Sequence, residues 1–183
     1  MRMTPVEIPL KDGRTLLLRN AEVSDAKIML DYLHATYQET PYLLQDVQEA
    51  DRISLEKEER FLENRLNSSN SIMIAGFIDG EHVGNCSFQP AGFADRVAHR
   101  CSMGIAMYLK YAGQGIGALF MEELMKQARA CGYEIMELEA VEGNERAMRL
   151  YQKMGFEVIG LRKRAIRYRD GSYASEYLMQ REL

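Results

Sequence analysis

Several stretches of the chain carry the alternating or the short continuous apolar patterns that are typical of β-strands. Turn residues join six of these stretches in pairs. Three hairpins are therefore expected: Val6–Leu10 with Arg14–Arg19, Ser71–Ile78 with Val83–Gln89, and Glu157–Tyr168 with Tyr173–Glu182. Two further strands are expected at His99–Leu109 and Ile135–Val141.

Other segments carry apolar residues at helical spacing. The clearest runs from about Gly115 to Cys131, because Ile116, Phe120, Leu124 and Ala128 lie four residues apart on one face. Shorter helices are expected after Ser24 or Asp25, over Ser54–Leu66 and over Asn144–Met154, and the polar stretch Thr36–Ile53 is expected to be a loop.

This order of elements predicts an α+β fold with a mixed, mostly antiparallel central sheet flanked by about four helices. One β-α-β-α passage runs from His99 to Met154. Residues 1–183 are expected to form a single domain, because two domains would each have a thin core.

Net charge, the length of apolar runs and the cysteine spacing restrict the classes of protein to which this chain can belong. The net charge of −4 argues against nucleic-acid binding through a basic face. The longest apolar run, Ile72–Ile78, is too short to span a membrane, and the first residues lack the apolar core of a signal peptide. Three widely spaced cysteines match no metal pattern and suit reduced thiols. We therefore expect a cytoplasmic protein without metal.

A glycine-rich turn precedes the clearest helix. It reads KYAGQGIG over residues 110–117, with Gly113, Gly115 and Gly117 at alternate positions. The N–H groups at a helix start are unpaired donors at the positive end of the helix dipole, so they attract phosphates. Glycine lets the backbone approach such a ligand closely. A packing turn would need only one glycine, so three favour a phosphate cradle.

The same turn also satisfies the dinucleotide fingerprint, as Gly113-x-Gly115-x-x-Ala118, with Glu137 and Glu139 near the spacing of the ribose-binding acid. The order of elements argues against a nucleotide-dependent enzyme. After the turn the chain holds one parallel crossover and then a hairpin, which cannot complete a doubly wound sheet.

A second motif follows the strand Ile135–Val141: residues 144–156 read NERAMRLYQKMGF. Taken alone, this run could be an ordinary apolar helix stripe capped by Asn144. Together with the glycine turn, it resembles the GNAT superfamily of acetyl-CoA-dependent N-acetyltransferases. The resemblance is strong from about His99 to Phe156, and the order of elements extends it over nearly the whole chain.

The resemblance implies that the turn holds the pyrophosphate of acetyl-CoA, the cosubstrate. The residues then expected to contact it are Met107, Ala112, Gly113, Gln114, Gly115, Ile116, Gly117, Ala118 and Asn144. In the family, a primary amine attacks the thioester directly in a ternary complex, and a backbone N–H on the strand before the turn stabilises the oxyanion. Tyr151 matches the family's tyrosine that protonates the departing thiolate.

Two positions depart from the family pattern. Ala112 stands where relatives often have Arg or Gln, which removes one side-chain contact to the phosphates. Ser102 stands where many relatives carry a glutamate. A lysine-like amine has a pKa of ~10.4, so a base must take its proton at neutral pH, and serine is a poor base. A water chain, Glu139 or a residue of the first helix–loop region could serve instead.

The family builds its acceptor pocket from the segment between the first two helices and from the last hairpin, here Tyr37–Leu44 and roughly Ile166–Tyr177. Glu39 could attract an ammonium group and Tyr42 could wall an apolar group, although both also suit an ordinary loop. The implied acceptor is a small-molecule amine or a peptide N-terminus. The basic cluster Arg162–Arg167 is interpreted as an exposed strand face rather than a binding site.

A catalytically silent acyl-CoA sensor is the alternative function. The missing glutamate favours it, and Tyr151 argues against it. GNAT enzymes of this size are frequently dimers, and the last hairpin offers a strand edge for pairing, so a homodimer is expected.

Overall fold

The chain folds into eight strands and five α-helices, and the computed structural model describes residues 1–183. The strands are β1 (Val6–Pro9), β2 (Thr15–Asn20), β3 (Ile72–Ile78), β4 (Glu81–Pro90), β5 (Arg100–Met107), β6 (Ile135–Val141), β7 (Glu157–Arg167) and β8 (Tyr173–Glu182). The α-helices are α1 (Ala26–Glu39), α2 (Val47–Ala50), α3 (Leu55–Asn67), α4 (Ile116–Ala130) and α5 (Glu145–Lys153). Short 3-10 turns are η1 (Val23–Asp25), η2 (Asp95–Val97) and η3 (Leu109–Tyr111).

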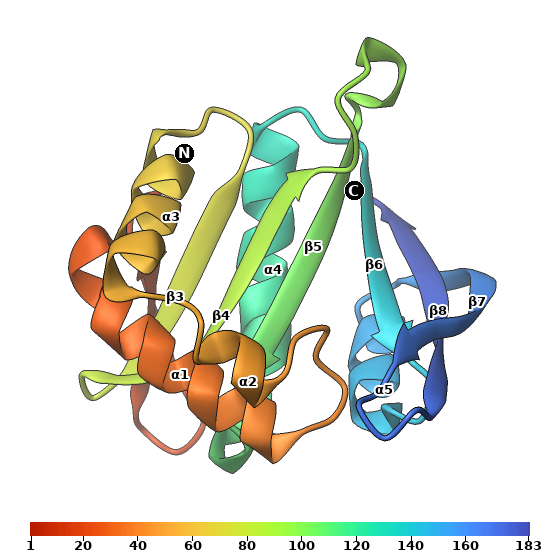
Figure 1. The fold of residues 1–183 in the computed structure, drawn as a ribbon. Coiled ribbons are helices and arrows are strands. Elements are labelled where there is room, and N and C mark those ends of the chain that lie inside the picture. The colour runs from red at the N-terminus through yellow and green to blue at the C-terminus, as the bar shows by residue number, and fades with distance from the viewer.

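All eight strands form one sheet in the order β1-β2-β3-β4-β5-β6-β8-β7. Every neighbouring pair is antiparallel except β5 and β6, which are parallel. This topology confirms the expected mixed α+β fold and its three hairpins. Helices α1, α2 and α3 cover one face of the sheet, and α4 and α5 cover the other (Figure 1).

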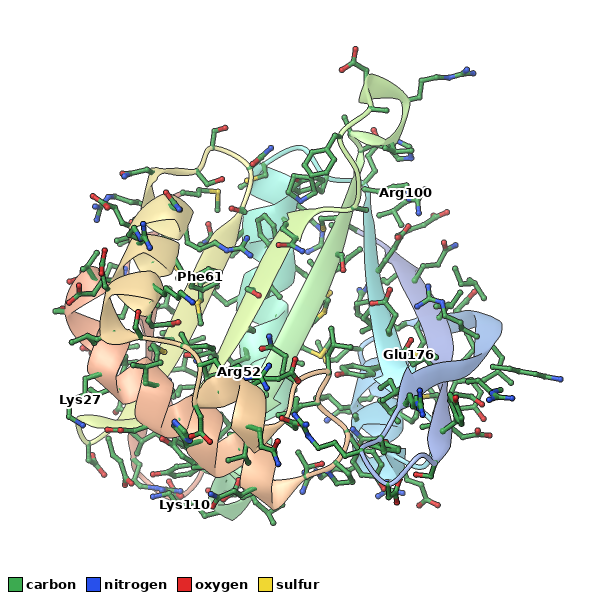
Figure 2. The ribbon with its side chains drawn as sticks, in the orientation of Figure 1. Lys27, Arg52, Phe61, Arg100, Lys110 and Glu176 are labelled. Carbon is green, nitrogen blue, oxygen red and sulfur yellow. The ribbon has the colours of Figure 1, made fainter.

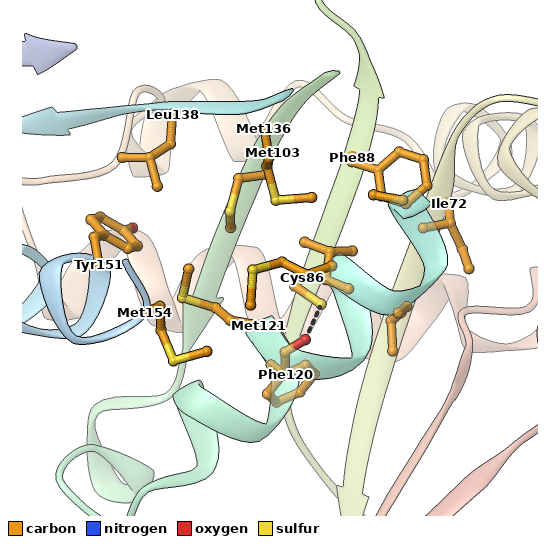
Figure 3. Packing of buried hydrophobic residues seen from close by; sticks show 14 of the residues in the cluster. Ile72, Cys86, Phe88, Met103, Phe120, Met121, Met136, Leu138, Tyr151 and Met154 are labelled. Atoms are coloured by element: carbon orange, nitrogen blue, oxygen red, sulfur yellow. Dashed lines mark hydrogen bonds between the residues drawn. The ribbon is translucent and has the colours of Figure 1, made fainter. Parts of the chain in front are cut away.

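The main core lies between the sheet and the α4 face and contains 25 buried residues, some of which are drawn in Figure 3. Ile116, Phe120, Leu124 and Ala128 of α4 are each 0% exposed, which confirms the helical spacing read from the sequence. Helix α4 packs so closely that a Cβ on Gly76 of β3 would lie 2.3 Å from the Phe120 ring. Only glycine fits at this contact.

Helix α2 was not predicted from the sequence. The stretch Thr36–Ile53, expected to be a polar loop, contains the last turn of α1 and the whole of α2. A capping box starts α2: the Asp46 side chain accepts from the Glu49 N–H at 3.0 Å, and the Glu49 carboxylate accepts from the Asp46 N–H at 3.0 Å. Two hydrogen bonds thus hold a helix too short to show hydrophobic periodicity.

Strands β5 and β6 separate along their length. Their register holds only three pairs, and the last of these is Ser102 with Glu137. Beyond it, β5 continues paired with β4, and β6 continues paired with β8. Figure 1 shows the two ribbons diverging toward the end of the sheet where α5 lies. This split in the sheet positions the site described below.

None of the helices combines the length and the apolar character that a membrane crossing requires.

Candidate active site

A cavity of about 800 Å³ opens where β5 and β6 separate. Its walls come from both faces of the sheet: from α1 and the loop after it on one face, and from the glycine turn, α4 and α5 on the other. Residues on β3, β4, β5, β6, β7 and β8 complete it. The split therefore connects the two faces of the sheet through a single cavity.

The backbone of β5 presents free polar groups to this cavity. The Tyr108 N–H donates to Val83 O and the Ala91 N–H donates to Arg100 O, so the even-numbered residues of β5 bond to β4. In an antiparallel pair the alternate residues direct their N–H and C=O groups the other way. Ile105 and Met107 therefore direct theirs toward β6, which no longer pairs with β5 at that level. Both residues line the cavity.

The glycine turn forms one end of the cavity. Gly113 and Gly115 take left-handed φ angles of +77° and +82°, and a Cβ added to either would meet nothing within 4 Å. The turn is therefore open on its outer side, where it meets the N-terminus of α4. Ala112, Gly113 and Gly115 line the cavity. This arrangement fits a phosphate group on the helix N-terminus.

Gly117 and Ala118 also line the cavity, but Gly117 has a second role. A Cβ at this position would lie 3.0 Å from Leu150 Cδ2 of α5 and 3.5 Å from Met107 Cε. The absence of a side chain here lets α4 and α5 approach each other beside the end of β5.

Two residues of the turn direct their side chains elsewhere. Ile116 is fully buried in the core. The Gln114 amide donates to Lys110 O at 2.8 Å and its Oε1 accepts from Arg14 at 2.8 Å, and neither Gln114 nor Ile116 lines the cavity. Their contribution to a ligand would be limited to the backbone.

Helix α5 supplies the opposite wall. Asn144 caps it by accepting from the Ala147 N–H at 3.2 Å, and both residues line the cavity. Tyr151, one turn further on, is 9% exposed and also lines the cavity. Its hydroxyl takes part in none of the protein's side-chain hydrogen bonds, and Figure 3 shows it turned away from Met154 toward the space near Met103. Burial raises the pKa of Tyr151 to about 12, so the phenol stays protonated near neutral pH.

The sequence model described as the acetyltransferase (GNAT) family matches residues 30–156. The chain belongs to this family. A GNAT acetyltransferase from Streptococcus pneumoniae superposes with a TM-score of 0.85 and 30% identity, covering 92% of this chain and 99% of the other. The structure of yncA from Salmonella typhimurium with its cofactor acetyl-CoA superposes with a TM-score of 0.80 and 18% identity, covering 92% and 94%.

Among curated relatives, the L-methionine sulfoximine/L-methionine sulfone acetyltransferase of Pseudomonas aeruginosa is 26% identical over 114 residues. That match covers 59% of this chain and 63% of the relative. The chain spans less than two thirds of the length of the curated relatives it matches, with shares from 20% to 63%.

Two residues, Glu39 and Tyr42, were expected at the acceptor pocket on the α1 face of the sheet. Only one of them lines the cavity. Tyr42 lines the cavity, with its hydroxyl 3.6 Å from the position of a Cβ on Gly143. Glu39 does not line the cavity. Its Oε2 accepts from the Leu109 N–H at 2.7 Å, and so ties the end of α1 to η3, directly before the glycine turn.

Two carboxylates, those of Glu139 and Glu176, and the Arg162 guanidinium line the cavity on the α1 face of the sheet. Glu139 of β6 is exposed and takes part in no protein hydrogen bond or ion pair, whereas Glu176 of β8 is buried and accepts from Arg162 Nη1 at 3.1 Å. Figure 2 shows Glu176 where β8 passes β6. Ser102, at the position of the family's common glutamate, does not line the cavity.

Sequence reasoning missed Glu176. It interpreted Arg162 as part of an exposed strand face, and the Arg162 side chain is indeed 54% exposed, but it also lines the cavity. A regular hairpin closed by Arg167 and Tyr173 would pair Arg164 with Glu176. Instead, Lys163–Ala165 form a bulge opposite a single residue, and the register shifts so that Arg162 lies opposite Glu176. Arg164 sits in the bulge with a φ of +53°. Only the pairing of opposite charges on the two strands could have indicated this contact.

Proposed function

We propose that the protein transfers an acetyl group from acetyl-CoA to a primary amine of a small molecule or a peptide N-terminus, by direct attack in a ternary complex. The observation that carries this proposal is the continuous cavity through the split between β5 and β6. The glycine turn lies at one end, and a pocket walled by α1 and the α1–α2 loop lies at the other. A thioester and an amine can therefore meet from opposite faces of the sheet.

Acetyl-CoA would supply an activated acetyl thioester and a leaving thiol. Residues of this chain that suit it are the N–H groups of Gly113 and Gly115 with the α4 N-terminus for the pyrophosphate, and Met107 with Asn144 for the pantetheine arm. The left-handed φ angles and the open outer side of the turn support this placement. No group of three or more His, Cys, Asp or Glu side chains is arranged as metal ligands.

The free backbone of β5 would stabilise the charge that develops during attack. The N–H groups of Ile105 and Met107 are directed into the split by the alternation of the β4–β5 ladder. Donors fixed in a strand need little reorganisation, which makes such groups effective for an oxyanion.

Tyr151 would donate its proton, or a strong hydrogen bond, to the departing sulfur. Its hydroxyl takes part in no protein hydrogen bond, and the raised pKa keeps the phenol protonated near neutral pH. Removal of a proton from the acceptor ammonium is assigned to Glu139, directly or through water, because this carboxylate lines the cavity without a protein partner. Glu176, in contrast, is held by Arg162.

A thermal-shift panel with acetyl-CoA, CoA, NAD and ATP tests the binding part of this proposal. We expect stabilisation by acetyl-CoA and CoA only. Preferential stabilisation by NAD would contradict the placement of CoA on the glycine turn. A screen of amines for thiol release then separates the enzyme from the silent acyl-CoA sensor, since the sensor would bind acetyl-CoA without turnover.

A further inference from the structure

The cavity carries a particular distribution of charge. Five charged side chains line it. Arg146 and Lys153 belong to α5, which forms the CoA side of the cavity. Glu139, Glu176 and Arg162 belong to neighbouring strands on the acceptor side. We call the part of the cavity on the α1 face of the sheet the acceptor half. It holds one cation and two anions, and its other side chains are neutral.

Arg162 has unused binding capacity. Its guanidinium contacts Glu176 through one nitrogen, and its side chain remains 54% exposed, whereas that of Glu176 is 11% exposed. A guanidinium offers five N–H donors in a planar fork that matches a carboxylate. Glu176 fixes one arm of this fork, so the other donors stay available to a ligand in the cavity.

The bulge in β7 is what brings this pair together. It places Arg162 opposite Glu176 and directs Ala165 and Ile166 to the cavity wall. The Arg164 side chain instead stacks on Tyr173, with its guanidinium carbon 3.9 Å from the ring centroid, and does not line the cavity. Two arginines separated by a single residue thus have different surroundings.

The mouth of the acceptor half is bridged. Arg169, in the β7–β8 turn, forms a two-pronged ion pair with Asp46, and its Nη2 lies 3.0 Å from Asp46 Oδ1. The Tyr168 hydroxyl donates to Pro41 O at 3.2 Å. These contacts hold the α1–α2 loop, whose Tyr42, Leu43 and Leu44 line the cavity, against the β7–β8 turn. A compact acceptor fits under this bridge better than an extended chain.

We infer that the acceptor is an amino acid: a small molecule with a free carboxylate beside its primary amine. The carboxylate would bind the free arm of Arg162, and the ammonium would lie toward Glu139 and Glu176. This inference rests on the proposed acetyl transfer. In that reaction the C–N bond forms as the C–S bond breaks. The ammonium loses two protons, of which one goes to the leaving sulfur and one to solvent.

The test measures binding to the CoA-loaded protein and thiol release with acetyl-CoA, for the twenty common amino acids and their amides. Peptides that begin with the same residue and the matching decarboxylated amines complete the panel. We expect at least one amino acid to bind and react at least ~10-fold better than its amide, because a site built for a charged group discriminates against analogues that lack it.

Arg162→Gln gives the residue-level test. The glutamine amide can still donate to Glu176, so we expect the fold to be retained. The planar set of guanidinium donors that matches a carboxylate is lost. We expect KM for the preferred amino acid to rise at least ~10-fold and that for its decarboxylated amine to change little, since Arg supplies the bidentate contact. Arg164→Gln is the matched control, outside the cavity, and should leave both constants unchanged.

The outcomes separate the two proposals. If acetyl-CoA and CoA do not bind, the proposed function fails, and this inference with it. If they bind but no amino acid is preferred over its amide, or if Arg162→Gln affects carboxylate-free amines equally, acetyl transfer stands and the amino-acid acceptor is wrong. Binding of CoA with no response to any member of the panel also overturns the amino-acid acceptor.

Discussion

Individual residues at the glycine turn have separable roles. Gly115 has a left-handed φ and an open outer side, whereas Gly117 sits where a side chain would press against Leu150. Gly115 is thus free to face a ligand, and Gly117 chiefly allows two helices to pack. The regular spacing of the glycines in the sequence conceals this difference.

Gly115→Ala tests the cradle. A left-handed φ with a Cβ costs ~1–2 kcal/mol, so the free energy of unfolding should fall by about that amount. We also expect CoA affinity to fall at least tenfold, because the new methyl group occupies the open side of the turn.

Gly132→Ala is the matched control, with a φ of +84° and equally open space at the other end of α4. It should lose similar stability and keep its CoA affinity, as measured by isothermal titration. Equal CoA affinity in the two folded variants would place the phosphates elsewhere.

Residues that could be predicted from the sequence are those whose role depends on the local backbone. The glycine turn, the Asn144 cap and the position of Tyr151 on the cavity wall follow from motifs on contiguous elements. The contact between Arg162 and Glu176 depends on a bulge whose residues carry no turn signal, so the pattern of alternation gave no sign of it.

At the scale of elements, the split between β5 and β6 brings the site together. The order of elements predicted one parallel crossover after the glycine turn, and the structure confirms it in the parallel pair β5 and β6. The point at which they part is a tertiary feature and has no counterpart in the alternation pattern of either strand. The same holds for the α1–α2 loop, which is held by contacts more than a hundred residues away in sequence.

The bridge between Arg169 and Asp46 can be removed without touching the cavity wall. We expect Arg169→Ala to raise KM for the acceptor several-fold while CoA affinity stays the same, because the α1–α2 loop loses its ion pair with the β7–β8 turn and keeps only the hydrogen bond from Tyr168. The Arg169 guanidinium lowers the pKa of Asp46, so the pair persists at neutral pH and is lost only as pH falls below the usual aspartate range.

Lys27→Ala is the control for this change, since it breaks an exposed 2.9 Å ion pair with Asp31 on α1. Steady-state kinetics on Arg169→Ala and Lys27→Ala measures the acceptor KM of each variant. An acceptor KM that Arg169→Ala leaves at the wild-type value would show that the bridge does not shape the pocket.

For the whole molecule, burial of several phenols and thiols predicts weaker folding at high pH. Burial raises the pKa of Tyr37, Tyr133, Tyr151 and Cys101 to about 12. The unfolded chain ionises earlier, near ~8.5 for thiols and ~10 for phenols. The folded state then holds more protons, so stability should fall as pH rises from about 8.5 toward 12.

The urea midpoint measured between pH 7 and 11 checks this. Tyr133→Phe removes one such phenol and should make the decline shallower, at the cost of the hydrogen bond from Tyr133 to Asn70 O. A urea midpoint that stays constant up to pH 11 would contradict the burial of these phenols and thiols.

The sheet leaves β7 as a free edge with exposed Val158, Ile159 and Leu161. We therefore propose a homodimer that pairs through this strand. Light scattering should show a dimer for the wild type and a monomer for Ile159→Lys. A wild-type monomer across a wide concentration range would rule this out.

The central claim is that the cavity between β5 and β6 carries an acetyl transfer with Tyr151 at the leaving sulfur. The most direct test is the rate of thiol release at saturating acetyl-CoA for wild type and Tyr151→Phe, with one reacting amine. Because the hydroxyl makes no protein hydrogen bond, we expect unchanged folding and CoA affinity, and general acid catalysis predicts a turnover lower by ~10²–10⁴-fold. A Tyr151→Phe rate within about threefold of wild type would remove Tyr151 from the mechanism, since a positioned acid contributes far more.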